Sequence, residues 1–273
     1  AFMSLTGNHI KCMNTQGAVA LNRNTANGSI GNSSITQKDI NRVLELTQGI
    51  ALPPDRDILH TIPQEFIVDT LEKIDNPIGL SGRRLEGHVH LVTAATTAMK
   101  NLVDSAEELG ININGLVFKP LAAAISTLTK DEIKLGVSLI DIGSTTTGVA
   151  IFKDGAVRHS AVIPIGSASI TNDIAVMLRI SIEQAEEIKM KYASAKASLS
   201  SSNLDIEIPS NNNDSDIQKI SENELSKYVE ARMEEIFQLA QNEINRSGIN
   251  NSLTYGVVLT GGGSQLKNIV PFA

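Results

Sequence analysis

The strongest local signal in the sequence is Leu139-Ile140-Asp141-Ile142-Gly143-Ser144-Thr145-Thr146-Thr147. Its apolar residues predict a strand that carries the Asp141 carboxylate into a turn of small residues rich in hydrogen-bond donors. Backbone N–H groups and hydroxyls in such a turn can wrap a phosphate, and the carboxylate can hold a hydrated Mg²⁺ ion through water. The alternative is a plain β-hairpin with an aspartate at its turn. The motif G-x-x-x-x-G-K-[ST] occurs nowhere in the chain, which argues against a Walker-type NTPase.

More strands are expected on both sides of this stretch. Residues 136–141, 147–152 and 156–163 each read as a strand, and the short turns between them predict an antiparallel meander. A last strand at 255–260 runs into Gly261-Gly262-Gly263-Ser264. Glycines let a backbone approach a flat ligand such as a nucleoside, and a helix beginning near Ser264 would offer its N-terminus. Read alone, these residues form only a flexible turn.

Two helices between these strands are marked by their N-terminal caps. The capping boxes pair Ser181 with Gln184, ahead of a helix at 182–192, and Ser221 with Glu224, ahead of a helix through Asn245.

The first of these helices carries a charged pair. Glu186 and Lys189 lie one turn apart on one face, an arrangement that by default is a solvated helix surface. The longer helix is expected to bury Val229, Met233, Ile236 and Ala240 and to leave Arg232, Glu235 and Glu243 at the surface. Between the two helices, 204–208 is the only strand that we expect.

The N-terminal part predicts a small α+β unit. It consists of a loop at 15–34, a helix after Thr36 and an extended stretch at 59–68 that Pro63 interrupts. Strand and helix then alternate: a strand at 84–91, a helix with a stripe of Met99, Leu102, Val103, Ala106 and Leu109, a strand at 111–118 and a helix from Pro120.

Composition limits the class of protein. The 273 residues are 41% hydrophobic and 19% charged, which is typical of a folded chain. Lys and Arg number 23 against 30 Asp and Glu, so the net charge of −7 argues against nucleic-acid binding. The single cysteine fits a reducing compartment, so we expect the cytoplasm. No apolar run approaches the roughly 18 residues that span a bilayer.

In chain order, the phosphate loop, the Glu186–Lys189 helix and the glycine turn resemble the superfamily of actin, sugar kinases and heat-shock ATPases. Three further segments, 60–65, 76–83 and 85–91, resemble the FtsA family of bacterial cell-division proteins. The resemblance covers nearly the whole chain, and 76–83 is its most specific part. It implies an α/β protein with α+β elements: an actin-like ATPase fold, incomplete, with the small α+β subdomain of the FtsA type.

The resemblance also implies boundaries. Residues 1–83 correspond to the small subdomain, 84–133 to the rest of the first core subdomain, 134–172 with 250–273 to the second core subdomain, and 173–249 to the outer helical subdomain. The family's first phosphate loop is then expected ahead of Ala1 and its amphipathic membrane helix beyond Ala273, so the chain is expected to be an internal fragment.

Site residues follow from the same resemblance, which implies ATP and Mg²⁺ as ligands. Asp141, Gly143 and Thr146 match the phosphate-loop pattern, whereas Ser144 and Thr145 replace two of its glycines and Gly148 replaces an acidic residue. The residues expected at the adenosine end are Glu186, Lys189, Gly261, Gly262, Gly263 and Ser264, and Asp141 is expected to hold Mg²⁺ through water.

Hydrolysis is expected to be slow or undetectable. Relatives carry an acidic residue, which positions the attacking water, where this chain has Lys119. A cation cannot act as that general base, so its contribution of roughly 10²–10⁴-fold should be missing. An active ATPase or sugar kinase of the same fold, and an adaptor like the pilus-assembly protein PilM, are the alternatives.

The resemblance implies partners as well. They are the C-terminal tail of FtsZ, other division proteins, further copies of the protein in actin-like filaments, and the inner face of the plasma membrane at the division site. Arg232 resembles the family's FtsZ-recognition arginine, although an exposed helix arginine is by default a solvated charge. His88 and His90 share a strand face, but no third ligand lies near them in sequence, so they are expected to be ordinary strand residues.

Overall fold

The structure, a computed structural model, describes residues 1–21, 23–24, 30–31, 33–208 and 218–273. The chain forms two compact units. The first comprises Ala1–Ser138, Ala150–Ala161 and Asn251–Gly256, and the second comprises Leu139–Val149, Val162–Asn250 and Val257–Ala273.

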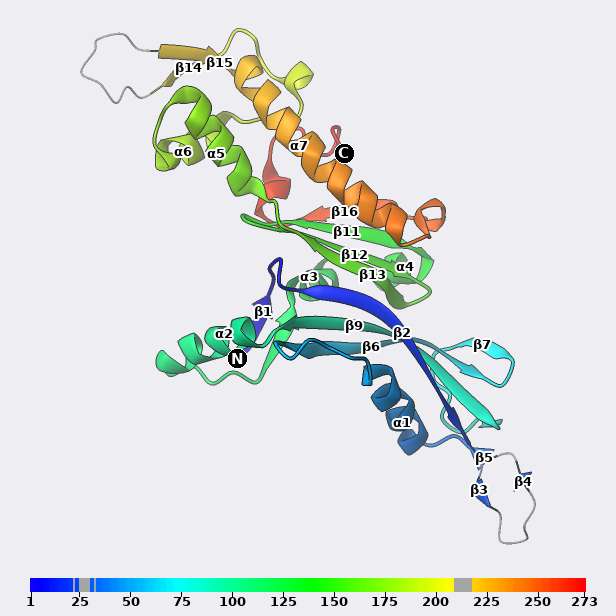
Figure 1. The fold of residues 1–273 in the computed structure, drawn as a ribbon. Coiled ribbons are helices and arrows are strands. Elements are labelled where there is room, and N and C mark those ends of the chain that lie inside the picture. Colours follow the sequence, from blue (N-terminus) through cyan, green and yellow to red (C-terminus); the bar gives the residue numbers. More distant parts are fainter. Residues whose placement is uncertain (22, 25–29, 32, 209–217) are drawn as a thin grey trace. The chain divides into compact units, whose positions relative to one another are not determined.

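An antiparallel sheet in the order β2-β9-β6-β7 forms the centre of the first unit (Figure 1). Its strands are β2 (Lys11–Ala20), β9 (Arg84–Ala95), β6 (Arg56–Val68) and β7 (Leu71–Ile74). The helix α1 (Gln37–Gln48), with its N-cap at Thr36 as predicted, packs on this sheet.

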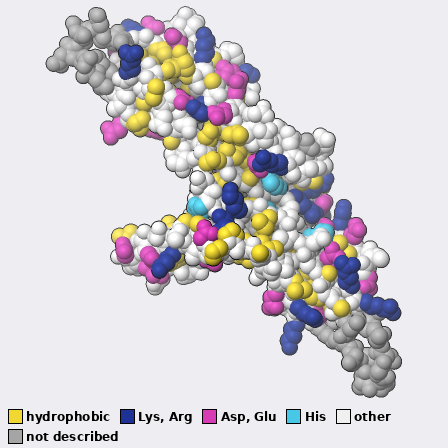
Figure 2. All heavy atoms as spheres, viewed as in Figure 1, with side chains coloured by type: hydrophobic (Ala, Val, Ile, Leu, Met, Phe, Trp, Pro, Cys, Tyr) yellow, Lys and Arg dark blue, Asp and Glu magenta, His cyan; other side chains and the backbone are white. Residues whose placement is uncertain are grey.

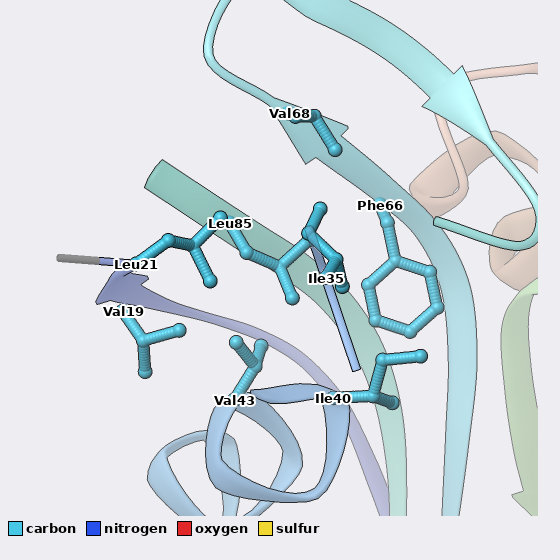
Figure 3. Close-up of a cluster of buried hydrophobic side chains, with 8 residues drawn as sticks. All are labelled: Val19, Leu21, Ile35, Ile40, Val43, Phe66, Val68 and Leu85. Atoms are coloured by element: carbon cyan, nitrogen blue, oxygen red, sulfur yellow. The ribbon is translucent and has the colours of Figure 1, made fainter. Parts of the chain in front are cut away.

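One cluster of buried hydrophobic side chains in this unit lies between α1 and the sheet (Figure 3). An added Cβ at Gly87 on β9 would lie 2.7 Å from Val43 Cγ1, so only a glycine lets α1 approach the strand this closely. The buried cluster consists of Val19, Leu21, Ile35, Ile40, Val43, Phe66, Val68 and Leu85.

Two predictions for the sheet of this unit are wrong. Residues 15–20 of the expected loop belong to β2, because their backbone pairs with β9 while most of their side chains remain outside the core. Residues 23–24, 30–31 and 33–34 of the expected loop also form short strands. Residues 22, 25–29 and 32 of that loop lie outside the described residues. Pro63 does not interrupt β6, because the register with β9 shifts between Pro63 and Glu65. Such an irregularity accommodates a residue that has no N–H to donate.

The remaining elements of the first unit include a parallel pair, β1 (Phe2–Leu5) with β10 (Gly115–Phe118). The strand expected at 111–118 is therefore shorter than predicted. Leu109, expected on the apolar stripe of the following helix, is 78% exposed and lies one residue beyond the end of α2. The other bounds are α2 (Thr96–Glu108), α3 (Lys119–Thr127), α4 (Lys130–Leu135), β3 (Arg23–Asn24), β4 (Ile30–Gly31), β5 (Ser33–Ser34) and β8 (Ser81–Gly82).

A further sheet has the order β13-β12-β11-β16. The predicted succession of three neighbouring strands is confirmed, and the two-residue connection at Asp154-Gly155 is one that only antiparallel strands can use. All six residues of β11 are buried. The bounds are β11 (Val137–Ile142), β12 (Thr147–Lys153), β13 (Ala156–Ile163) and β16 (Val257–Thr260).

Three helices dominate the second unit, and α5 contacts both of the others. They are α5 (Ser167–Leu178), α6 (Ile182–Tyr192) and α7 (Glu222–Arg246). The capping box of Ser181 and Gln184 is confirmed. Of the second predicted box, the described residues contain only the hydrogen bond that Glu224 N–H donates to Ser221 Oγ. The predicted buried residues of α7 are confirmed. The prediction that Glu243 lies at the surface is wrong, since its side chain is only 14% exposed and contacts Arg246.

Shorter elements complete this unit. The predicted strand β14 (Asp205–Ile208) pairs with β15 (Gln218–Ser221), which the sequence analysis missed. The 3₁₀ helices are η1 (Ala197–Leu199), η2 (Asn250–Ser252) and η3 (Gly262–Gln265). The first residue of η2 belongs to the second unit and its other two residues belong to the first. In the described part of the chain, no helix has the length and apolar character that crossing a bilayer requires. On the face seen in Figure 2, cationic and anionic side chains are interspersed.

Candidate functional site

The loop at 143–146 connects β11 to β12. Gly143 N–H donates to Thr146 O over 2.9 Å and closes the turn. Ser144 and Thr145 are exposed at its tip, whereas Asp141 is only 3% exposed at the end of β11. The loop therefore presents two hydroxyl side chains to solvent above a nearly buried carboxylate.

The N-terminus of α5 supports this loop. Ser167 N–H donates to Gly143 O over 2.9 Å, and Ala168 N–H donates to Ser144 O over 2.8 Å. A Cβ at Gly166 would lie 2.4 Å from Ser144 O, so a larger residue would displace the loop. Gly166 was not among the predicted site residues, and its only signal in the sequence is a glycine directly ahead of a helix.

The glycine turn after β16 packs against the end of β11. A Cβ at Gly261, where φ is +88°, would lie 2.5 Å from both Asp141 Oδ1 and Ile142 O. A Cβ at Gly263 would lie 2.3 Å from Ile142 Cγ2, whereas a Cβ at Gly262 would meet nothing within 4 Å. Two of the glycines are therefore required by packing within the protein, and Gly262 leaves an open surface.

The prediction of a helix that begins near Ser264 is wrong. The turn continues as the four-residue 3₁₀ element η3, and the Ser264 hydroxyl donates to Gly261 O over 2.7 Å. This hydroxyl thus stabilises the turn itself.

Glu186 and Lys189 form an ion pair on α6, with 2.7 Å between Oε2 and Nζ. The solvated helix surface is not what the structure contains, because Lys189 is only 7% exposed. Its ammonium also donates to Thr171 Oγ1 at 2.8 Å and Ser167 O at 3.3 Å, both on α5. Burial alone would raise the pKa of the Glu186 carboxyl, but the hydrogen bonds from Lys189 and Thr171 outweigh it, and the pKa is lowered.

A cavity of about 360 Å³ brings the pair and the glycine turn together. Neighbouring positions line it from α5, α6 and the chain that follows β16. The lining residues are Ser167, Glu186, Lys189, Met190, Ala193, Gly262, Gly263, Gln265, Leu266 and Lys267.

The donor set near the loop suits phosphate better than a protein-held metal. Asp141 is the carboxylate at the loop, and the described residues contain no group of three or more His, Cys, Asp or Glu arranged to hold a metal ion. Magnesium keeps several waters and commonly binds through one or two carboxylates together with substrate phosphates. A single carboxylate, Asp141, is thus compatible with a Mg²⁺ ion whose other ligands are water and the phosphates of a bound ligand.

Arg232 on α7 is not a free charge. Its guanidinium forms a two-point ion pair with Asp173 on α5, with Nε–Oδ2 at 2.7 Å and Nη2–Oδ1 at 3.0 Å, and it also contacts Glu235. The Asp173 hydrogen bonds raise the pKa of Arg232, against the opposing effect of burial. The pair borders a cavity of about 480 Å³ that is lined by Asp173, Val176, Met177, Tyr228, Ala231, Arg232 and Glu235.

The remaining predicted residues lie in the first unit. Lys119 is the partly buried first residue of α3. His90 is buried and hydrogen-bonds Asn14 Oδ1 at 2.6 Å and Ser160 Oγ at 2.7 Å. His88 pairs with Glu65 and Glu86 instead.

Comparison with known proteins supplies the family. The model for "Cell division protein FtsA" matches residues 138–273, and that for "SHS2 domain inserted in FTSA" matches residues 7–93. The FtsA proteins of Pseudomonas aeruginosa and Escherichia coli K12 are 41% and 33% identical to the whole chain. The chain spans 63% and 64% of their respective lengths.

Solved structures share the fold. The chain resembles one in a PilM-PilN type IV pilus biogenesis complex, with a TM-score of 0.65 and 15% identity over 99% of this chain and 64% of that one. It also resembles MreB5 of Spiroplasma citri bound to ADP, with a TM-score of 0.55 and 22% identity over 66% of this chain and 57% of that one. These neighbours confirm the actin-like fold, and the two family models with the identity across the whole chain show that it belongs to the FtsA family of cell division proteins.

Proposed function

We propose that this chain supplies the second phosphate loop and the adenosine pocket of an ATP-binding, actin-like adaptor in bacterial cell division. In this proposal, the protein links FtsZ filaments to the inner face of the plasma membrane at the division site, recruits other division proteins and associates with copies of itself. In this proposal the family's four subdomains correspond to residues 1–83, 84–133, 134–172 together with 250–273, and 173–249.

The cavity beside Gly262 carries the proposal. Gly262 leaves one wall open, and the Glu186–Lys189 pair provides polar groups on another wall. The phosphate loop is tied to both walls, through Gly261 against Asp141 and through α5. A nucleotide with its nucleoside in this cavity and its phosphates toward residues 143–146 would contact Gly262, the Glu186–Lys189 pair and the phosphate loop.

Magnesium and hydrolysis complete this part of the proposal. Asp141 would hold the Mg²⁺ that accompanies the phosphates through water, and the ion would neutralise phosphate charge. With Lys119 where relatives carry an acidic residue, the chain favours binding over rapid turnover.

The experiment uses two glutamates that are neighbours on α6. Purified protein, at the full length encoded by its gene, is titrated with a fluorescent ATP analogue as wild type, Glu186→Gln and Glu187→Gln. Glu186 lines the cavity and Glu187 is exposed. A charge-assisted hydrogen bond is worth about 1.5–3 kcal/mol, so the first variant should bind at least about tenfold more weakly and the second like wild type. Equal dissociation constants for all three proteins would contradict the proposal.

A second binding site is proposed at the cavity between α5 and α7. Val176 is 79% exposed and Tyr228 42% exposed beside the Arg232–Asp173 pair. Exposed apolar side chains beside an arginine suit a short peptide with apolar and acidic residues, and the FtsZ tail is the proposed occupant. Because Asp173 already holds the arginine, an acidic peptide must compete with it.

Peptide binding can be measured by fluorescence anisotropy with the FtsZ C-terminal peptide. Arg232→Glu should weaken binding at least about tenfold. Asp173→Asn should strengthen it, because the competing carboxylate is gone. Arg246→Glu on the same helix is the matched control, since this arginine side chain is 71% exposed and lies outside the cavity. Binding that survives Arg232→Glu counts against Arg232 as the recognition residue.

A further inference from the structure

The Thr171 hydroxyl lies between the two charged groups of the adenosine pocket. Thr171 is on α5 and only 3% exposed. Its Oγ1 is 2.5 Å from Glu186 Oε2 and 2.8 Å from Lys189 Nζ. A hydroxyl has one hydrogen to donate and two lone pairs to accept with, so it can donate to the carboxylate while it accepts from the ammonium.

These hydrogen bonds restrict the side-chain rotamers of Glu186 and Lys189. Glutamate and lysine side chains each lose about 1.5–2 kcal/mol of rotamer freedom when they are fixed. An i,i+3 ion pair alone is a weak constraint. The bonds through Thr171 fix Glu186 Oε2, while the Glu186 side chain remains 42% exposed and lines the cavity.

The same helix supports the phosphate loop. One turn before Thr171, Ser167 N–H donates to the Gly143 carbonyl, and the Ser167 carbonyl accepts from Lys189 Nζ. The first turn of α5 therefore contacts both the phosphate loop and the charged pair.

We propose that Thr171 is a positioning residue that holds Glu186 and Lys189 ready for the ribose of a nucleotide, and that it sets the discrimination between ribonucleotides and 2′-deoxyribonucleotides. This inference rests on the proposed nucleotide site. Groups held in place before binding discriminate more sharply, because no ordering cost is added when the ligand arrives.

The test compares Thr171→Val, which removes the hydroxyl at nearly constant shape, with Thr171→Ser, which keeps it. Dissociation constants for ATP and for 2′-deoxy-ATP are measured on the full-length protein. Thr171→Val should bind ATP about tenfold more weakly and 2′-deoxy-ATP with little change, so that the ratio of the two constants collapses. Thr171→Ser should restore the wild-type ratio. An unchanged ratio in Thr171→Val overturns the inference. This holds whether both affinities stay at their wild-type values or both fall by the same factor, and the second result indicates a merely structural role.

Thr47→Val is the matched control. Thr47 is a buried helical threonine whose hydroxyl donates to Leu44 O of its own helix at 2.7 Å. It should leave both affinities unchanged.

A second readout needs no ligand and also serves if Thr171→Val does not fold. The pKa of the Glu186 carboxyl is followed by NMR in the nucleotide-free protein with Thr171→Ala. It should rise in this variant, because one hydrogen bond to the charged form is lost, and stay at the wild-type value in Thr171→Ser. An unchanged pKa in Thr171→Ala overturns the positioning role.

The two possible failures are distinguishable. If ATP affinity does not depend on Glu186, the proposed function fails and the inference fails with it. If ATP affinity depends on Glu186 but not on the Thr171 hydroxyl, only the inference fails.

Discussion

The glycine turn offers a sharp contrast between two neighbouring residues. Gly261 has φ +88° and ψ 168°, a conformation that is essentially restricted to glycine. A side chain there would also collide with Asp141 and Ile142 at 2.5 Å. At Gly262 an added Cβ meets nothing within 4 Å. We therefore expect Gly261→Ala to damage the fold and Gly262→Val to damage only the ligand site.

The magnitudes follow from these contacts. Backbone strain costs about 1–3 kcal/mol and overpacking costs typically about 1–3 kcal/mol, so Gly261→Ala should lose roughly 2–6 kcal/mol of unfolding free energy. That is a large part of the roughly 5–15 kcal/mol that holds a domain together. Gly262→Val should change the unfolding free energy by less than about 1 kcal/mol. Its side chain should weaken ATP binding at least about tenfold, because it occupies the cavity.

Urea denaturation followed by circular dichroism measures the first quantity, and titration with a fluorescent ATP analogue measures the second. The expected pattern is an unstable Gly261→Ala and a stable Gly262→Val that binds ATP poorly. Unchanged ATP affinity in a folded Gly262→Val would refute the assignment of the pocket. A Gly261→Ala as stable as wild type would refute the packing argument.

Three further predictions concern the first unit. Gly87→Ala should lower the unfolding free energy by about 1–3 kcal/mol in urea denaturation, because its Cβ would press on Val43 at 2.7 Å; no loss would contradict the close approach of α1. Burial, with a smaller effect of His159, lowers the pKa of His90 from 6.5 to about 4, so the unfolded chain binds a proton that the folded chain does not. The contribution of His90 to the unfolding free energy should be complete above pH 6.5 and fall progressively toward pH 4. At about 1.4 kcal/mol per pKa unit, the unfolding free energy of His90→Gln should fall by about 2 kcal/mol less than that of wild type between about pH 7 and 5. Equal losses in the two proteins would contradict this. Wild type should release phosphate from ATP far more slowly than roughly 10 per second, a typical enzyme rate, and Lys119→Glu should release it faster; rapid wild-type turnover would show that the Lys119 reasoning is wrong.

The parts of the fold that sequence predicts well are those with strong local signals. The apolar run of β11 and the capping residues Ser181 and Ser221 each fix an element through neighbours in sequence. The strand β2 was missed at Thr15 and beyond, because its pairing with β9 depends on backbone bonds to distant residues and its own side chains are mostly polar. The strand β15 likewise depends on its partner β14.

In the candidate site, too, contacts between sequence neighbours were predictable and contacts between distant residues were not. Spacing along α6 placed Glu186 beside Lys189, as the structure does. It could not reveal that Lys189 is buried, because the groups that bury and bind it come from α5. Nor could it show that Asp173 holds Arg232, since 59 residues separate these two side chains.

A crystal structure of the full-length protein with Mg²⁺ and a non-hydrolysable ATP analogue would show directly whether the nucleotide binds in the proposed site. We expect the adenosine beside Gly262, with Glu186 and Lys189 at the ribose end and the phosphates at residues 143–146. Nucleotide bound elsewhere, or no bound nucleotide at saturating concentration, would contradict this expectation.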